Sequence, residues 1–241
     1  LTKQKIGTAN YYVNEKLYSI LTKKYSKMEK QFWIESWDEG GFKTSFHRKD
    51  IHPYILEYLT PEKLKGKRVL VPLCGKSIDL CYFQKYAKHV VGVELAEKAI
   101  YQFFEEQALD FVKHGNRFES DKLTIIKADF FALSQADVGA IDLVYDRAAL
   151  VALPLAMRLN YVAKMQGLLA PNAQQFVNTL EYFPVKEEPP FSISPEELWS
   201  YYGNNFDLEH LKSPLVPNHG LIRCWGLDYV KEHGFLLTKK E

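Results

Sequence analysis

Four apolar runs of the chain each end at, or just before, a residue that could help hold an adenosine-bearing ligand. Gly75 lies in PLCGKS, Glu94 closes HVVGVE, Asp129 follows LTIIK, and Arg147 follows AIDLVYD. Apolar, β-branched runs of this length are typical of buried parallel strands. Because ligands bind at the carboxyl ends of such strands, we expect the four residues to lie around one site.

The segment from Pro72 to Ser77 contains a single glycine, Gly75. A glycine after a strand can bring the backbone close to a ligand, or it can simply make a tight turn into a helix. The segment lacks the GxGxxG pattern with which dinucleotide-binding folds hold a pyrophosphate. A ligand without phosphate groups therefore fits better than a nicotinamide dinucleotide.

Glu94 stands about 20 residues after this glycine, at the end of the second apolar run. A carboxylate at that place can accept hydrogen bonds from both ribose hydroxyls of an adenosine-type ligand, and it would repel a 2′-phosphate. An isolated glutamate could also be a solvated acid at a strand end. Its pairing with the Gly75 segment favours the ligand-binding interpretation.

Asp129 and Arg147 each allow two interpretations. Asp129 could accept a hydrogen bond from the adenine amino group, with Phe130 packed on the ring, or it could cap a helix. Arg147 could bind the carboxylate of an amino-acid portion or favour an anionic substrate, or it could form a buried pair with Asp146. We assign neither Asp146 nor Arg147 as a general base.

Aromatic residues gather before the first apolar run, at Trp33, Trp37, Phe42 and Phe46. Such rings can wall a pocket for a cationic sulfonium and a flat heterocycle. They could equally pack an N-terminal helix against the sheet.

The elements that position these residues alternate between strands and helices. We expect strands at 67–72, 89–94, 123–127, 140–145 and 174–180, and helices that begin near Ser77, Ala96, Pro154 and Ser194. Residues 112–121 read as a loop, and His233-Gly234 reads as a hairpin turn between strands 226–230 and 234–238. This order predicts a parallel sheet covered on both faces.

Composition excludes several classes of protein. The 241 residues carry 31 basic and 30 acidic side chains, so the net charge of +1 gives no reason to bind nucleic acid. No apolar run approaches the ~18 residues of a membrane span. The chain has an odd number of cysteines, Cys74, Cys81 and Cys224, which predicts free thiols and a cytoplasmic protein. Their spacing matches no zinc-binding pattern, so no metal site is expected.

Several segments, in order, resemble the thiopurine S-methyltransferases, especially the bacterial ones. They are VLVPLCGKSIDL (69–80), VVGVEL (90–95), ADFFAL (128–133), YDRAALVALP (145–154) and PPFSISPEEL (189–198). The similarity runs from about Met28 to the C-terminus, so residues 28–241 are expected to form the methyltransferase domain. Residues 1–27 would then be a mobile arm or an extension before the natural start.

The resemblance implies a Rossmann-like α/β fold of the class I methyltransferases. Such a fold has a mostly parallel seven-stranded sheet, helices on both faces and an antiparallel C-terminal strand. The methyl donor would be S-adenosylmethionine, which leaves as S-adenosylhomocysteine. The acceptors would be aromatic or heterocyclic thiols, with selenium or tellurium species as further candidates. We separately expect a monomer, although the near-neutral surface neither requires nor forbids association.

The resemblance also places Trp37, Leu73, Glu94 and Arg147 at cofactor-contacting positions and Phe46 at the mouth of the substrate pocket. The strand-tip argument adds Gly75 and Asp129 to the cofactor site. Two departures concern the pocket: the spacing from Trp37 to Phe46 is about two residues longer than usual, and Glu188 replaces a common glycine.

Other functions remain open at this point. One is methyl transfer to halide, thiocyanate or another small acceptor. The others are a nicotinamide-dependent oxidoreductase on a similar sheet and a cofactor-binding sensor without activity.

Overall fold

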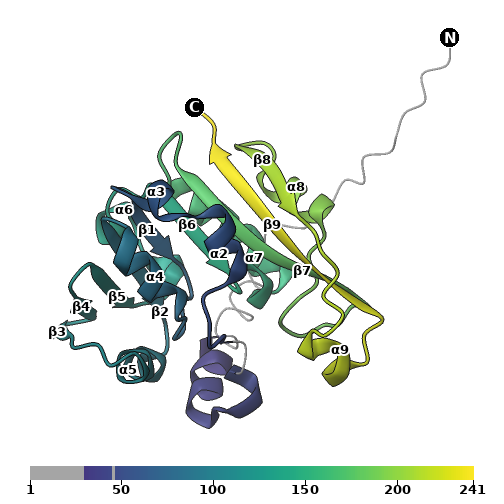
Figure 1. The fold of residues 1–241 in the computed structure, drawn as a ribbon, viewed down its shortest axis with the longest axis horizontal. Helices are drawn as coiled ribbons and strands as arrows, with labels where there is room; N and C mark the ends of the chain where they lie inside the picture. The colour runs from purple at the N-terminus through teal and green to yellow at the C-terminus, as the bar shows by residue number, and fades with distance from the viewer. Residues whose placement is uncertain (1–29, 45–46) are drawn as a thin grey trace, which may run out of the picture.

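A computed structural model describes residues 30–44 and 47–241 of the chain (Figure 1). The predicted extension 1–27 and the candidate substrate residue Phe46 lie outside the described residues.

Within the described residues, nine strands form one sheet in the order β3-β4-β5-β2-β1-β6-β7-β9-β8. The strands β5, β2, β1, β6 and β7 run parallel, whereas β9 pairs antiparallel with both β7 and β8. Their bounds are β1 Arg68–Val71, β2 His89–Glu94, β3 Val112–His114, β4 Arg117–Ser120, β5 Leu123–Lys127, β6 Leu143–Arg147, β7 Gln174–Phe183, β8 Phe206–Lys212 and β9 Tyr229–Lys239.

Helices cover both faces of the sheet, as predicted, and the residues of β1 show how the two cores are divided. Leu70 packs with α6, α7 and α8, while Val69 and Val71 pack with α2, α3, α4 and α5, because side chains alternate along a strand. The helices are α2 Pro53–Tyr58, α3 Pro61–Leu64, α4 Asp79–Tyr86, α5 Glu97–Glu106, α6 Gln135–Val138, α7 Leu155–Leu168, α8 Pro195–Tyr202 and α9 Gly220–Trp225. Residues 30–39 are also helical, and the 3₁₀ turns are η1 Gly41–Thr44, η2 Phe130–Ala132 and η3 Leu150–Ala152.

The predicted seven-stranded core corresponds to β5-β2-β1-β6-β7-β9-β8, and the structure adds the hairpin β3–β4 at one edge. The prediction of a loop over residues 112–121 is therefore wrong. Only Phe118 of this hairpin is buried, so its strands lack the apolar alternation that would indicate them. The one local signal is Gly115-Asn116 at the turn, where Gly115 has a φ of +61°.

The prediction of a hairpin at His233-Gly234 is also wrong, because β9 runs through both residues without a turn. Gly234 serves packing instead: a Cβ on it would lie 3.1 Å from two ring carbons of Tyr54. The expected strand start at Gly226 is the left-handed end of helix α9, with a φ of +63°. By contrast, the helix start at Ser194 is confirmed, since its hydroxyl accepts a hydrogen bond from the Glu197 amide.

Asp146 fastens helix α7 to strand β6 in the interior. Its buried carboxylate accepts hydrogen bonds from the Tyr161 hydroxyl at 2.7 Å and from the Leu150 amide at 3.1 Å. Burial raises the pKa of Asp146 to about 6, although these hydrogen bonds favour the carboxylate. The folded chain therefore holds a proton on Asp146 at pH values where the unfolded chain has released it.

The elevated pKa predicts a pH-dependent cost in stability. An aspartate titrates near 3.9 when unfolded, so the contribution of Asp146 to the free energy of unfolding falls as pH rises from about 4 to about 6, by up to about 3 kcal/mol. We expect Asp146→Asn to lack this fall, because its amide does not titrate. Denaturant unfolding from pH 4 to 7 measures it, with the exposed Asp207→Asn as control; parallel curves for wild type and Asp146→Asn would contradict the prediction.

Candidate active site

A cavity of about 870 Å³ opens where the parallel strands end. In Figure 1 the segment 30–44 and helix α9 lie beyond the same edge of the sheet, low in the view. Both contribute to the cavity wall, together with the loops after β1, β2, β5 and β6. The volume lies within the ~300–1,000 Å³ typical of small-molecule sites.

The structure brings the described candidate residues of the sequence together. This cavity is lined by all six of them: Trp37, Leu73, Gly75, Glu94, Asp129 and Arg147. The residues at the strand ends therefore lie around one cavity, as the sequence predicts.

Glu94 ties the end of β2 to the loop after β1. One carboxylate oxygen accepts a hydrogen bond from the Gly75 amide at 2.7 Å, and the other accepts one from the Ala96 amide at 2.8 Å. Burial raises the pKa of Glu94, whereas these two N–H groups favour its ionised form. Each oxygen keeps further lone pairs for a ligand, so the carboxylate is oriented before anything binds.

The segment before the sheet closes over Gly75. Gly75 has a φ of +52°, and a Cβ on it would lie 2.4 Å from His47 Nε2 and 3.2 Å from a ring carbon of Trp37. His47 Nε2 accepts a hydrogen bond from the Lys76 amide, and its Nδ1 donates to the Thr44 carbonyl, both at 3.0 Å. Burial is the main cause that lowers the pKa of His47 to about 4, so the ring is neutral at pH 7.

Asp129 caps η2, where its carboxylate accepts a hydrogen bond from the Phe131 amide at 3.1 Å. It also forms an ion pair with Lys30 of the first helical segment. The helix-cap interpretation is therefore confirmed. The same carboxylate still lines the cavity, so a ligand could reach it.

Asp146 and Arg147 serve different sides of strand β6. Asp146 bonds to Tyr161 of α7, whereas Arg147 lines the cavity, as alternation along a strand requires. Ala148 follows with a φ of +66°, and Leu73 after β1 has a φ of +47°. Non-glycine residues rarely adopt such angles, and they concentrate at functional sites.

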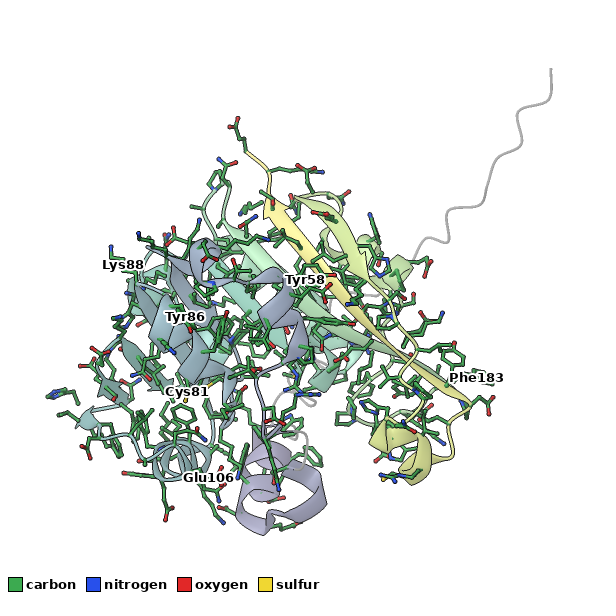
Figure 2. All side chains as sticks on the ribbon, in the orientation of Figure 1. Tyr58, Cys81, Tyr86, Lys88, Glu106 and Phe183 are labelled. Atoms are coloured by element: carbon green, nitrogen blue, oxygen red, sulfur yellow. The ribbon has the colours of Figure 1, made fainter. Side chains whose placement is uncertain are left out.

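The sequence did not reveal the opposite wall of the cavity. Strand β6 ends with Arg147 beside Asn178, but β7 and β9 continue as a two-stranded ribbon to the exposed Phe183 (Figure 2). Pro189 and Pro190 of the PPFSISPEEL segment line this wall. The ribbon and helix α9 supply further residues that the sequence did not indicate as site residues: Asn178, Leu180, His219, Cys224, Trp225 and Glu232. No local motif indicates these further residues, because this wall depends on how far β7 and β9 extend beyond the end of β6.

Two properties of the described residues bear on other functions. No group of three His, Cys, Asp or Glu side chains among them could hold a metal ion. None of the helices found in that part of the chain has the length and apolar character needed to cross a membrane.

Comparison with known proteins decides the family. The profile of the family described as thiopurine S-methyltransferase matches residues 28–240. The chain belongs to the thiopurine S-methyltransferase family. The thiopurine S-methyltransferase of Legionella pneumophila (strain Paris) is 40% identical over 217 residues, which cover 86% of this chain and 97% of that protein. That of Pseudomonas fluorescens (strain SBW25) is 38% identical over 194 residues, covering 77% and 87%.

Solved structures agree with this family at the level of fold. The 1,6-didemethyltoxoflavin-N1-methyltransferase of Burkholderia thailandensis, with S-adenosylhomocysteine bound, has a TM-score of 0.59 at 14% identity and covers 91% of this chain and 90% of its own. The N-methyltransferase NodS of Bradyrhizobium japonicum, also with S-adenosylhomocysteine, has a TM-score of 0.57 at 11% identity and covers 86% and 98%. The predicted class I methyltransferase fold is thereby confirmed.

This member of the thiopurine S-methyltransferase family is an S-adenosylmethionine-dependent methyltransferase. The geometry of the site fits that cofactor. A buried carboxylate at the end of β2 lines the cavity, and the missing side chain of Gly75 lets His47 and Trp37 approach the loop after β1 closely. Trp33 and Trp37 supply aromatic surface, which suits a positively charged sulfur.

The close approach at Gly75 generates a prediction. We expect Gly75→Ala to weaken S-adenosylhomocysteine binding at least about 10-fold, because the new methyl group must displace His47 and disturb the loop that holds Glu94. Gly66→Ala is the matched control, since Gly66 has a φ of +78° with open space around it. Both variants should lose about 1–2 kcal/mol of stability from backbone strain. Calorimetric titration measures the binding, and equal affinities in the two variants would contradict the prediction.

Proposed function

We propose that this chain transfers the methyl group of S-adenosylmethionine to the sulfur of small aromatic or heterocyclic thiols. The observation that carries the proposal is one continuous cavity with two different ends. It extends from Glu94 and Asp129, past the tips of β1 and β6, to the ribbon formed by β7 and β9. Its volume of about 870 Å³ leaves room for an acceptor beside the cofactor.

Residues on the β2 side would hold the cofactor. Glu94 would accept hydrogen bonds from the ribose hydroxyls, Leu73 and Gly75 would pass close to the ligand, and Asp129 would accept from the adenine amino group. Arg147 lies further along the cavity, where its guanidinium could bind the carboxylate of the amino-acid portion or an anionic acceptor.

Methyl transfer requires mainly that the two reactants are aligned and that water is excluded from the cavity. When bound, S-adenosylmethionine supplies a methyl group on a positively charged sulfur. The aromatic and apolar walls exclude water, which favours a reaction that neutralises opposite charges. Holding both reactants in line can lower the barrier by as much as about 7–11 kcal/mol. A thiol that ionises readily needs no strong base, so no single side chain is expected to be indispensable.

The names of the relatives and the lining of the cavity support the acceptor class. The relatives from Legionella and Pseudomonas carry the name thiopurine S-methyltransferase, which supports a flat heterocyclic thiol. The apolar wall formed by Val151, Leu180 and Trp225 suits a ring. Selenium or tellurium species, and halide or thiocyanate, are smaller soft acceptors that the same cavity would bind with less contact.

A parallel assay tests the acceptor class. We expect methylated product from thiophenols and heterocyclic thiols at a kcat/KM at least about 10-fold above that for iodide, thiocyanate or a selenium oxyanion, because a ring buries apolar surface in the cavity. Mass spectrometry of the methylated products measures all of them together. Faster turnover of iodide or thiocyanate would favour a halide-type methyltransferase instead.

Calorimetry with S-adenosylhomocysteine tests the role of Glu94. We expect Glu94→Ala to lose one or two charge-assisted hydrogen bonds, each worth about 1.5–3 kcal/mol, and so to bind at least about 10-fold more weakly. Glu105→Ala, an exposed substitution on nearby helix α5, serves as control. Equal binding by wild type and Glu94→Ala would remove the basis for placing the ribose at this residue.

A further inference from the structure

A second carboxylate, Glu232 of strand β9, stands on the far wall of the cavity and is held rigidly. His52 Nδ1 accepts a hydrogen bond from the Tyr54 amide at 3.2 Å, so the ring proton sits on Nε2. That nitrogen donates to Glu232 Oε1 at 2.9 Å. The Tyr54 hydroxyl donates to the Glu232 carbonyl, also at 2.9 Å. Both the backbone and the side chain of Glu232 are therefore fixed by the start of helix α2.

The Glu232 carboxylate is ionised at neutral pH. Burial alone would raise its pKa, but the hydrogen bond from His52 and the positive charges of Arg147 and Arg48 together lower it. The side chain is 20% exposed and lines the cavity. Among residues 30–44 and 47–241, His52 is the one recorded hydrogen-bond or ion-pair partner of this carboxylate, which leaves Oε2 able to accept from a ligand.

The place of Glu232 in the sheet assigns it to the acceptor end. It pairs with Leu180, two residues beyond the point where β6 ends beside Asn178. Glu94 lies on β2, across β1 and β6 from this ribbon. A ligand held by Glu94 at its ribose would have to extend past β1 and β6 before it met Glu232.

On the basis of the proposed function, we propose that Glu232 recognises the ring N–H next to the sulfur of a heterocyclic acceptor in its thione form. A carboxylate oxygen accepts such an N–H, and the hydrogen bond strengthens as the sulfur reacts. Glu232 is then a specificity-determining residue for thiones that carry this N–H. A benzenoid thiol lacks the N–H and forms no such hydrogen bond to Glu232.

Methyl transfer to a thione has two parts, formation of the carbon–sulfur bond and loss of the ring proton. The thione sulfur uses a lone pair to form a bond to the methyl carbon, and the carbon–sulfonium bond breaks with its electron pair left on the departing thioether. Positive charge passes to the ring nitrogen of the acceptor. The N–H bond then breaks: its proton goes to Glu232, and its electron pair returns to the ring, which leaves a neutral methylthio heterocycle. Neither an oxidant nor a metal is needed.

The chain offers a matched control pair outside the cavity. Glu181 of strand β7 bonds to His233 Nε2 at 3.0 Å, and the exposures of the two side chains, 20% and 1%, equal those of Glu232 and His52. Glu181 does not line the cavity. Glu181→Gln therefore reproduces the loss of a carboxylate from a buried glutamate–histidine pair without touching the site.

The experiment compares Glu232→Gln with Glu181→Gln on two acceptors. 2-Mercaptopyridine carries an N–H beside its thione sulfur, and thiophenol has none. We expect Glu232→Gln to lower kcat/KM for 2-mercaptopyridine about 10- to 100-fold and to change that for thiophenol less than about 3-fold, because one charge-assisted hydrogen bond is lost. Glu181→Gln should change neither. Glu232→Asp, which keeps the charge on a shorter side chain, should lose an intermediate amount on 2-mercaptopyridine alone.

A binding measurement separates this inference from the proposed function. Calorimetry of 2-mercaptopyridine with the protein–S-adenosylhomocysteine complex should show a matching loss of affinity in Glu232→Gln, even if neither acceptor is methylated. Equal losses for both acceptors, or no loss for either, would overturn the role of Glu232. If Glu232→Gln fails to fold, the acceptor selectivity of Glu232→Asp decides, and equal effects on both acceptors would again overturn it.

Discussion

The active-site edge depends on one buried carboxylate that joins two neighbouring strands. Glu94 ends β2, and its two oxygens accept hydrogen bonds from the amides of Gly75 and Ala96. The Cys74 amide adds a hydrogen bond to the Val93 carbonyl at 2.9 Å. Burying a carboxylate without such hydrogen-bond donors would cost folding free energy. The loop after β1 must therefore keep its amides turned toward β2. The hydrogen bonds that offset the cost of burying Glu94 therefore also fix the surface that faces a ligand.

The tight turns at the strand tips follow from that constraint. Leu73, Gly75 and Ala148 all have positive φ, and each follows β1 or β6 within a few residues. Only glycine adopts such angles freely, so the two other residues hold strain that the surrounding packing must offset. Leu73, Gly75 and Ala148 all line the cavity, so these turns form part of its wall at the tips of β1 and β6.

The sequence indicates the residues that line the Glu94 end of the cavity but not those at the Glu232 end, and the reason is the range of the interactions. Glu94 and Gly75 are 19 residues apart, one at the end of β2 and the other in the loop after β1, so local apolar runs suffice to bring them together. Glu232 and His52 are 180 residues apart, and their contact depends on β9 pairing with β7 rather than turning back at Gly234. No period or turn signal carries that information, since a glycine that accommodates the Tyr54 ring looks the same in sequence as one that makes a hairpin.

This division also explains why a cofactor can be inferred from the chain more readily than an acceptor. The ribose-binding carboxylate proposed here needs a strand end and a turn, which short segments encode. The acceptor wall needs the relative lengths of β6, β7 and β9, the position of α9 and the proline pair before α8, none of which is a local property. Within that wall the charged residues Arg147, Arg48 and Glu232 lie close enough to influence one another, as the lowered pKa of Glu232 indicates. A wholly apolar acceptor would leave the half-buried carboxylate of Glu232 without a hydrogen bond from the ligand. Under the proposed role of Glu232, the wall is therefore better matched to a polar-edged heterocycle than to a wholly apolar ring.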